Sequence, residues 1–382
     1  MSELIPASGT VHWIGAGLST GSGVGVVCDL ADRLVLWART DQKAQDRIGK
    51  LGLSGRARGA AFTLDLLAST LRAGDVVVSM LPAAEHADLL RLCLRHGAHF
   101  ACSSYVSEPI SAQVPAAERA GVVVMTEAGL DPGIDHLFAH RLVAQGRAAI
   151  GDASAVAEFT SYCGGIPAVP NEFRYQFSWA PRGVLSALCQ PARCIEDGEQ
   201  KSIIHPWEAV RPLALNGEIF EVYPNRDSLP FISQYTMPST WRLTTFVRGT
   251  LRSQGWSSAW AEVFAELLAG DNDRIDKLAN ELAIRYPTTE ADFDRVVLAV
   301  ALKLRGNDSR EWSGQYLIDL LGDESESAMA RCVSLPLSFG IARILAGEMP
   351  AGLHRAAEDA DEARRWLGFL DEHGIHCEFS EA

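Results

Sequence analysis

Short apolar runs alternate with helix-length stretches over the first 125 residues of the chain. Five runs without polar alternation are typical of buried strands, at residues 11–14, 34–37, 76–81, 99–102 and 122–125. Between them lie stretches suited to helices, at residues 22–31, 41–50, 63–71, 84–96 and 112–120. Continuous apolar strands separated by helices indicate a parallel sheet covered on both faces. The pattern predicts an α/β fold whose first domain, residues 1–130, is a doubly wound sheet of the Rossmann type.

The pattern changes after residue 130. We predict a helix at 137–144, followed by β-branched or alternating stretches at 155–162, 218–223 and 241–251. The last alternates so that Arg242 and Arg248 share the open face of a half-exposed antiparallel strand. Helical spacing then predicts helices at 257–268, 275–286, 290–304, 325–345 and 360–370. We therefore expect an α+β substrate-binding domain at 131–255 and a helical subdomain at 256–324. The segment from about 325 to 382 could pack back on the first domain.

A glycine-rich turn, residues 14–21 (IGAGLSTG), follows the first apolar run. Such a turn lets backbone N–H groups approach a pyrophosphate at the start of a helix. The usual spacing is Gly-x-Gly-x-x-Gly, whereas here Thr20 holds the third position and Gly21 comes one residue late. Glycines also serve ordinary loops, but the strand and helix on either side favour dinucleotide binding. The expected cofactor contacts are Gly15, Gly17, Leu18, Ser19 and Thr20, with Leu81 and Pro82 at the end of the third predicted strand.

The end of the second apolar run bears on which dinucleotide binds. An acidic residue about twenty residues after the turn would bind the ribose 2′-hydroxyl of NAD. The chain instead offers Arg39 and Thr40, a cation and a hydroxyl that suit the 2′-phosphate of NADP. Asp41 would favour NAD if the register slipped by one residue, and Arg39 could also be a solvated surface charge. The sequence favours NADP over NAD and leaves both open.

Six longer motifs resemble the glutamate-forming saccharopine dehydrogenases, also called saccharopine reductases. In chain order they are residues 103–107 (SSYVS), 129–136 (GLDPGIDH), 161–165 (SYCGG), 177–183 (FSWAPRG), 223–228 (YPNRDS) and 248–252 (RGTLR). Weaker matches at 327–331 and 373–378 extend the resemblance to nearly the whole chain. It implies NAD(P)-dependent oxidation of saccharopine to L-glutamate and L-2-aminoadipate 6-semialdehyde, or the reverse, in lysine metabolism. It also implies a homodimer. The chain departs from the family pattern at 168–173, 285–325 and 349–365.

The chemistry of that reaction requires groups that move protons. A protonated secondary amine cannot release hydride, so the site must accept its proton, activate water and protonate the departing amine. The resemblance places Asp131 and Tyr105 in the active site. Asp131 could instead cap the following helix from its Asp-Pro-Gly turn, and Tyr105 could be an aromatic at the sheet edge. Asp135 and His136 are weaker candidates, and we expect Cys163 to line the site without being essential, because hydride transfer needs no nucleophile.

Saccharopine resembles a tricarboxylate, and planar guanidinium groups bind carboxylates in bidentate geometry. Arginines should therefore recognise the substrate, with Arg226 first and Arg248 next, while Arg252 adds a further cation. The expected substrate-binding residues are Arg226, Arg248, Asn225, Trp179 and Arg182. Each arginine could instead pair with a nearby carboxylate, as Asp227 beside Arg226 illustrates, and Trp179 could be plain core packing.

Composition narrows the setting. The 382 residues, 47% hydrophobic, can form two or three domains. The net charge of −14 argues against nucleic acid, which needs a basic face, and an anionic substrate would need a local cluster of cations. No secretory signal or eighteen-residue apolar run is evident, so we expect no membrane segment. The eight cysteines lack metal-ligand spacing, and we expect no metal and a cytoplasmic setting.

Three hypotheses about function follow. The leading one is a saccharopine dehydrogenase of the glutamate-forming kind. The second is a related enzyme acting on another secondary amine, of the opine or carboxyalkyl-polyamine type; an acidic pocket would suit a polyamine, whereas the arginines favour carboxylates. The third is a non-catalytic nucleotide-binding protein, against which the joint presence of Tyr105, Asp131 and Arg226 argues.

Overall fold

The computed structural model describes residues 3–151, 154–178, 181–289 and 292–381. The chain forms two compact units. The first comprises the chain up to Leu137 together with Ala330–Ala357 and Arg365–His373. The second comprises Phe138–Met329, Glu358–Arg364 and the chain from Gly374 onward. Helices α7, α13 and α14 contribute residues to both units.

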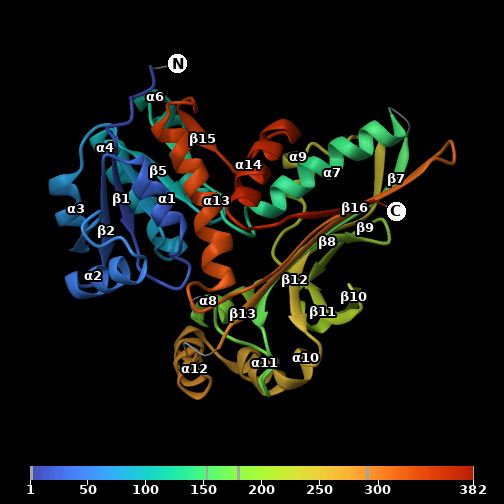
Figure 1. The fold of residues 1–382 in the computed structure, drawn as a ribbon. Helices are drawn as coiled ribbons and strands as arrows, with labels where there is room; N and C mark the ends of the chain where they lie inside the picture. The colour runs from blue at the N-terminus through green and yellow to red at the C-terminus, as the bar shows by residue number, and fades with distance from the viewer. Residues whose placement is uncertain (1–2, 152–153, 179–180, 290–291, 382) are drawn as a thin grey trace. The chain divides into compact units, whose positions relative to one another are not determined.

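A parallel sheet of seven strands organises the first unit (Figure 1). Its order is β15-β6-β5-β4-β1-β2-β3, and every neighbouring pair is parallel. The strands are β1 Thr10–Ile14, β2 Arg33–Ala38, β3 Arg58–Ala61, β4 Val76–Ser79, β5 His99–Cys102, β6 Val123–Met125 and β15 Gly352–His354. Because the order reverses at β1, a dinucleotide is expected at the carboxyl ends of β1 and β4. The predicted Rossmann architecture is confirmed.

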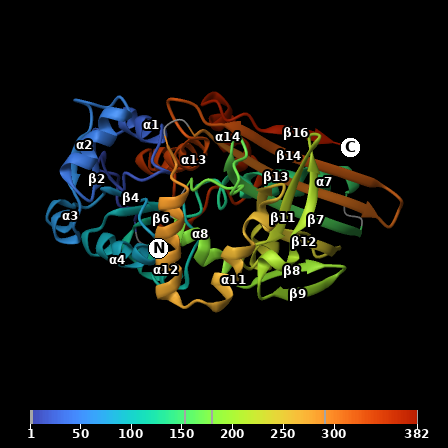
Figure 2. The same cartoon turned by 90° about the horizontal axis from the view of Figure 1, so that it is seen from below.

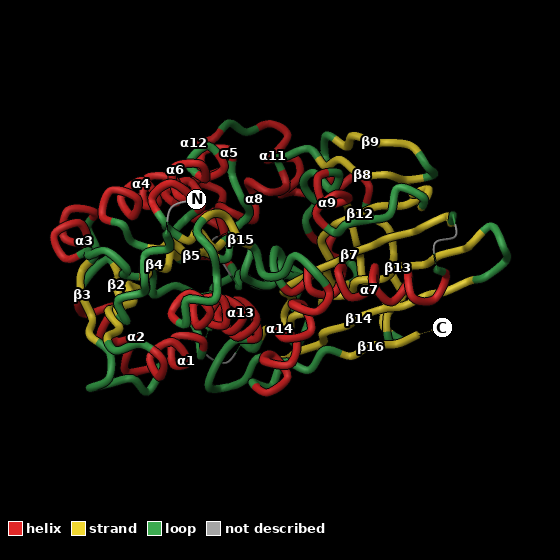
Figure 3. Tube along the Cα trace, turned by 90° about the horizontal axis from the view of Figure 1, so that it is seen from above, coloured by secondary structure: helices red, strands yellow, loops and turns green. Residues whose placement is uncertain are grey.

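Helices cover both faces of this sheet. Figure 3 shows α3, α4 and α6 on one side and α1 and α13 on the other. The helices are α1 Gly23–Leu30, α2 Asp41–Lys50, α3 Leu64–Thr70, α4 His86–His96, α5 Glu108–Ser111, α6 Val114–Ala120, α13 Ala328–Leu345 and α14 Ala360–Glu372, with a 3₁₀ turn at Ala83–Glu85. Both sheet faces are therefore buried, which explains the continuous apolar strands.

Helix α13 is long and apolar enough to cross a membrane by length and composition alone, and it is the one such helix among the described residues. In the structure 61% of it is buried. Phe339 of α13 packs against Trp366 of α14, with ring centroids 5.0 Å apart. Packing of this kind identifies α13 as a core helix of the first unit.

The second unit is built on a nine-stranded mixed sheet. Its path is β10-β11-β12-β7-β13-β14-β16, and β8 joins β12 and β9 beside it. The strands are β7 Ala155–Pro167, β8 Ala192–Glu196, β9 Glu199–Ile203, β10 Arg211–Leu215, β11 Glu218–Pro224, β12 Trp241–Ser253, β13 Asp294–Gly306, β14 Glu311–Leu321 and β16 Glu378–Glu381. Figure 2 shows β7, β12, β13 and β14 side by side.

Strand β12 differs from its prediction. It pairs antiparallel with β11 but parallel with β7, so it is an interior strand of the sheet. Arg242 is exposed, as predicted, whereas Arg248 is only 3% exposed. The prediction of a shared open face was wrong: a register shift between Leu243 and Thr245 puts Arg248 on the face opposite Arg242. There Phe231 covers its guanidinium group.

The helices of the second unit are α7 Ile134–Ile150, α8 Pro181–Leu188, α9 Pro230–Gln234, α10 Trp256–Ala259, α11 Ala261–Ala269 and α12 Asn272–Arg285, with a 3₁₀ turn at Pro206–Ala209. The helix predicted at 290–304 was wrong, because Asp294–Gly306 is strand β13. A run such as Val296–Val300 is apolar throughout and rich in valine, so it suits a strand buried on both faces. The predicted helical subdomain therefore stays helical only as far as Arg285.

Candidate active site

The glycine turn connects β1 to α1. Gly15 has φ +119°, and a Cβ there would lie 2.9 Å from Cβ of Met80, so only glycine fits. Apart from its two chain neighbours, no residue that the structure describes has a heavy atom within 4 Å of the place a Cβ on Gly17 would take. Gly17 and Leu18 are exposed. This open backbone before the N-terminus of α1 fits a pyrophosphate group.

Thr20 closes the turn where a third glycine usually stands. It is fully buried. Its hydroxyl donates to the carbonyl oxygen of Gly15 at 3.0 Å, and its N–H donates to the carbonyl oxygen of Gly17 at 3.2 Å. The close helix packing is made by Gly23 instead, where a Cβ would lie 2.0 Å from the carbonyl oxygen of Ser334. The sequence prediction missed Gly23, because its partner stands 311 residues away.

Arg39 and Thr40 follow β2 at the carboxyl edge of the sheet. Arg39 is exposed, and no ion pair to it occurs among the described residues. The hydroxyl of Thr40 accepts the N–H of Lys43 at 3.2 Å and so caps α2. Asp41 accepts the N–H of Ala61 at 2.7 Å, which turns its carboxylate toward β3. Arg39 is therefore the group best placed to meet a 2′-phosphate.

Arg47 of α2 is a residue that the sequence prediction missed. Its Nη2 donates to the carbonyl oxygens of Ala16 at 3.3 Å and Gly17 at 2.9 Å. Helix α2 is thereby held against the glycine turn. Nothing in the local sequence pattern marks this contact, because Arg47 looks like an ordinary charged residue of an amphipathic helix.

Tyr105 and Asp131 meet at the carboxyl ends of β5 and β6. The Tyr105 hydroxyl donates to Oδ1 of Asp131 at 2.5 Å, and both residues are half-buried. Asp131 lies in a tight turn that is closed by a hydrogen bond from the N–H of Gly129 to the carbonyl oxygen of Pro132, at 2.9 Å. The two foremost catalytic candidates thus form one hydrogen-bonded pair.

A buried chain of charged groups lies beside this pair. Nε2 of His136 lies 3.1 Å from Oε2 of Glu127, and its Nδ1 lies 3.2 Å from Oδ2 of Asp135. Arg355, which follows β15, places its Nε 3.2 Å from the same Glu127 oxygen. Glu127, Asp135 and His136 are at most 3% exposed. Two carboxylates therefore face one imidazole and one guanidinium group.

These neighbours decide the ionisation of the network. Burial by itself lowers the pKa of His136, but the carboxylates of Asp135 and Glu127 outweigh it and raise that pKa to about 9. Burial likewise favours a high pKa for Glu127, yet His136, the N–H of Val106 and Arg355 bring that pKa to about 2. At neutral pH His136 is an imidazolium between two carboxylates.

In the second unit, polar candidates share one face of the sheet. Strands β7 and β12 are parallel, with Ser161 opposite Arg248 and Cys163 opposite Thr250. Because side chains alternate along a strand, Arg252 lies on the same face. Cys163 is half-buried. Trp179, another predicted residue, lies outside the described residues.

Arg248 is tied to the turn that precedes α9. Its carbonyl oxygen accepts the N–H of Asn225 at 2.9 Å, and its own N–H donates to the Ser228 hydroxyl at 2.9 Å. Its guanidinium carbon lies 3.8 Å from the ring centroid of Phe231. Asn225 thus contacts Arg248 through its backbone, and this hydrogen bond positions the turn against β12.

Arg252 is a buried cation surrounded by aromatic rings. It is 7% exposed, and its guanidinium carbon lies 4.8 Å from the ring centroid of Tyr175, 5.5 Å from Trp256 and 5.9 Å from Tyr223. Its Nη1 donates to the carbonyl oxygen of Leu251 at 3.3 Å, whereas its Nε has no hydrogen-bond partner in the part of the chain that the structure describes. No carboxylate in the described part of the chain forms an ion pair with it. A buried charge of this kind suits an anionic ligand.

The remaining predicted arginines are exposed. Arg226 has φ +57°, and its carbonyl oxygen accepts the N–H of Arg193 at 2.8 Å. Asp227, which the sequence offered as a possible partner of Arg226, forms an ion pair with Arg193 at 2.9 Å. Arg182 pairs with Asp276 of α12 at the surface.

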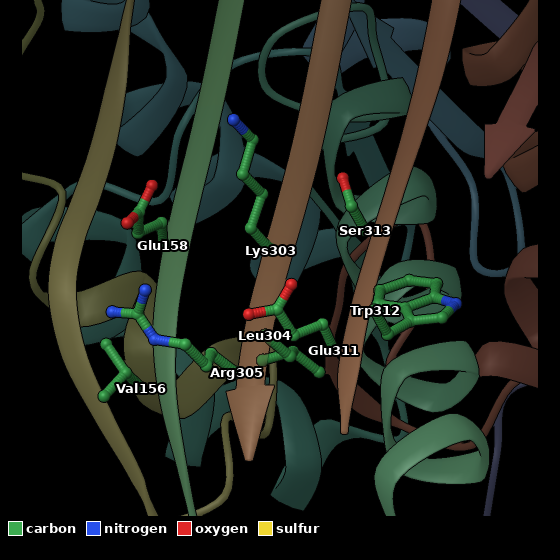
Figure 4. Close-up of a pocket in the computed structure, with 8 residues that line it drawn as sticks. All are labelled: Val156, Glu158, Lys303, Leu304, Arg305, Glu311, Trp312 and Ser313. Atoms are coloured by element: carbon green, nitrogen blue, oxygen red, sulfur yellow. The ribbon is translucent and has the colours of Figure 1, made fainter. Parts of the chain in front are cut away.

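Two hollows mark the second unit. One, of about 210 Å³, contains Glu158 of β7 and Lys303 and Arg305 of β13 (Figure 4). Alternation puts these side chains on the face opposite Cys163, and charges of both signs adjoin there. The other, of about 340 Å³, is lined by residues from Pro167–Gln176 and Arg285–Phe293, including Tyr175, whose ring also meets Arg252. The second hollow is therefore linked to the candidate substrate groups through Tyr175.

Two family models match the chain. Residues 11–125 match the saccharopine dehydrogenase NADP binding domain, and residues 129–375 match the saccharopine dehydrogenase C-terminal domain. Together they cover both predicted functional regions.

Named relatives agree with these matches. A saccharopine dehydrogenase [NADP(+), L-glutamate-forming] of Pyricularia oryzae is 35% identical over 261 residues, which is 65% of this chain and 56% of that protein. The mitochondrial alpha-aminoadipic semialdehyde synthase of Bos taurus is 31% identical over 72% of this chain and 31% of its own length. The chain spans about half the length of the dehydrogenases it matches.

Solved structures with this fold include the apo saccharopine dehydrogenase (L-Glu forming) of Saccharomyces cerevisiae. It aligns with a TM-score of 0.81 at 24% identity, over 98% of this chain and 99% of that one. A homospermidine synthase of Legionella pneumophila, in complex with NAD, aligns with a TM-score of 0.66 at 11% identity, over 100% of this chain and 93% of that one. These likenesses establish the fold.

Proposed function

Because this chain belongs to the saccharopine dehydrogenase family, we propose that it interconverts saccharopine with L-glutamate and L-2-aminoadipate 6-semialdehyde, using NADP. The observation that carries this proposal is the Tyr105–Asp131 hydrogen bond at the carboxyl edge of a sheet whose glycine turn fits a dinucleotide. Relatives named saccharopine dehydrogenase [NADP(+), L-glutamate-forming] support the choice of substrate.

The cofactor would be held by the first unit. The open backbone of Gly17 and the start of α1 would receive the pyrophosphate, with Leu18 and Ser19 beside it. Arg39 would bind the 2′-phosphate, which supports NADP over NAD. Asp41 is occupied by the N–H of Ala61, which argues against an NAD-type ribose contact.

The proposed oxidation begins with loss of one proton from the secondary ammonium group. NADP⁺, held by the glycine turn and Arg39, would supply the hydride acceptor, so that loss of hydride from the adjacent carbon leaves a C=N bond. Water then adds to that carbon, two of its protons pass in turn to the nitrogen, and the C–N bond breaks to leave aldehyde and amine. We assign the proton transfers to Asp131, with Tyr105 as its hydrogen-bonded partner. Cys163 would line the substrate without forming a covalent bond.

The substrate carboxylates would be bound in the second unit. Arg252 is buried and lacks a carboxylate partner among the described residues, and Arg248 lies on the same face of the sheet. Arg226 would add a cation from its exposed turn. These positive groups favour a multiply carboxylated amine and oppose the alternative, a cationic polyamine substrate.

The setting of the enzyme is part of the proposal. All eight cysteines are free thiols, which supports a reducing compartment such as the cytoplasm. A homodimer is expected from the family resemblance, and light scattering of the purified protein would test it.

Turnover assays test the function directly. Purified protein is mixed with saccharopine and either NADP⁺ or NAD⁺, and the absorbance of the reduced nicotinamide is followed. We expect turnover that is faster with NADP⁺ and is abolished or greatly reduced by Asp131→Asn. Folded protein that binds NADP⁺ yet oxidises a carboxyalkyl polyamine and not saccharopine would overturn the proposed substrate.

A further inference from the structure

We propose that Glu127, His136 and Asp135 form one positioning network that fixes the Tyr105–Asp131 pair. The kinetic part of this inference rests on the proposed function, whereas its structural part does not. The network lies in the first unit, between the end of β6 and the first turn of α7.

Glu127 holds the chain on both sides of Tyr105. Its N–H donates to the carbonyl oxygen of Ser104 at 3.0 Å, and its Oε1 accepts the N–H of Val106 at 3.0 Å. Glu127 itself has φ +51°, a conformation that costs energy in a residue other than glycine. Glu127 keeps this unfavourable backbone conformation at the position where its side chain and its main chain bind the two residues that flank Tyr105.

Asp135 holds the chain on both sides of Asp131 in the same manner. Its N–H donates to the carbonyl oxygen of Leu130 at 3.2 Å, and its Oδ1 accepts the N–H of Gly133 at 2.7 Å. Each partner of the Tyr105–Asp131 hydrogen bond is therefore flanked by two contacts to one acidic residue.

His136 joins the two acidic residues. One ring nitrogen faces Glu127 and the other faces Asp135, and the ring is fully buried. The imidazolium offsets the repulsion between carboxylates that would otherwise be buried near one another. With both nitrogens facing protein carboxylates, His136 acts through the positions of Tyr105 and Asp131 rather than on the substrate.

A matched pair of variants separates positioning from general stability. Glu127→Gln keeps the side-chain shape and removes the charge that faces His136. Asp75→Asn is the control, because Asp75 is also buried in this unit and pairs with His12 at 3.1 Å, but it precedes β4 at the opposite edge of the sheet. Both variants lose one buried carboxylate–histidine pair.

Hydrogen exchange measured by mass spectrometry tests the structural claim without any substrate. In Glu127→Gln, peptides covering residues 103–107 and 128–134 should exchange roughly tenfold faster or more. In Asp75→Asn these peptides should keep their wild-type rates. Unchanged exchange of both peptides in Glu127→Gln would overturn the proposal, and this outcome is independent of whether saccharopine is the substrate.

Kinetics then test whether the network acts through the pair. We expect Glu127→Gln to lower kcat about 10²-fold, since small displacements of catalytic groups cost rates of that order, with the Kd for NADP⁺ within about twofold of wild type. Asp75→Asn should keep kcat. Adding Tyr105→Phe to Glu127→Gln should reduce kcat little further, because both changes disturb the same group. Losses that multiply, or an equal loss of NADP⁺ affinity, would contradict the positioning role.

Discussion

The ionisation of His136 predicts how stability depends on pH. Its pKa of about 9 in the folded chain lies above the ordinary value of 6.5. The protonated network therefore contributes its full stabilisation below pH 6.5, and the contribution is lost as pH rises through 9. Glu127 has the opposite sign: with a folded pKa of about 2 against 4.5, its contribution is present above pH 4.5 and is lost as pH falls through 2.

The size of the effect follows from the shift of the His136 pKa. One pKa unit corresponds to about 1.4 kcal/mol, so a rise from 6.5 to 9 corresponds to about 3 kcal/mol of folding free energy. The shift of Glu127 arises largely from the same contact with His136, so the two contributions are not added. A stabilisation of this size is a large fraction of the stability of a typical domain.

Urea unfolding of wild type and His136→Gln between pH 6 and pH 10 measures this term. The difference in unfolding free energy between the two proteins should shrink by about 3 kcal/mol across that range. Asp75→Asn is the control: the pKa of Asp75 is lowered, so its contribution is lost only in acid and its difference from wild type should stay flat here. A His136→Gln difference that is constant with pH, or that disappears between pH 6 and pH 7, would refute a protonated His136. If His136→Gln does not fold, Glu127→Gln replaces it in this experiment. Its difference in unfolding free energy from wild type should also shrink as the pH rises from 6 to 10, because it removes one of the carboxylates that raise the pKa of His136.

Three further predictions concern the cofactor and substrate groups. Arg39→Ala should raise the Kd for NADP⁺ about 10- to 100-fold and leave that for NAD⁺ unchanged in titrations of each; equal effects would refute the 2′-phosphate contact. Arg252→Met should raise the KM for saccharopine by a similar factor at unchanged NADP⁺ affinity, whereas Arg242→Met, at an exposed position of the same strand, should change neither. Gly23→Ala should cost about 1–3 kcal/mol in thermal unfolding because its Cβ would meet backbone atoms. The control Gly25→Ala has open space and should be neutral or stabilising by up to about 1 kcal/mol.

The first unit could largely be predicted because each of its elements carries its own signal. Helix α2 spans Asp41–Lys50, the predicted range, because Thr40 provides a side-chain cap directly before it. Strand β3, Arg58–Ala61, was missed, since its sequence of arginine, glycine and two alanines lacks the β-branched residues typical of strands. It forms as an edge strand beside β2, where strand pairing and the hydrogen bond from the N–H of Ala61 to Asp41 replace intrinsic preference.

The second unit was harder to predict, since a continuous apolar run does not distinguish a buried helix from a buried strand. Strand β13 illustrates this, because its apolar residues Val296–Val300 are buried and its pairing with β7 joins segments that are distant in sequence. The parallel pairing of β12 with β7 was missed for the same reason, because these strands are also distant in sequence. Local alternation misses the register shift between Leu243 and Thr245, which puts Arg242 and Arg248 on opposite faces, and it does not reveal what covers a face.

Burial, which local sequence does not reveal, also determines which arginine we expect to contribute most to substrate binding. Arg226 ranked first in the sequence analysis because its turn motif is distinctive, whereas the structure leaves it exposed and encloses Arg252 among three rings from separate segments. An exposed cation gains little from binding a carboxylate, because water already solvates it. A buried cation such as Arg252, which has no carboxylate partner among the described residues, has lost that solvation, so a carboxylate ligand recovers more free energy there. We therefore expect Arg252→Met to weaken saccharopine binding more than Arg226→Ala does. The reverse order of KM values would contradict burial as the deciding factor.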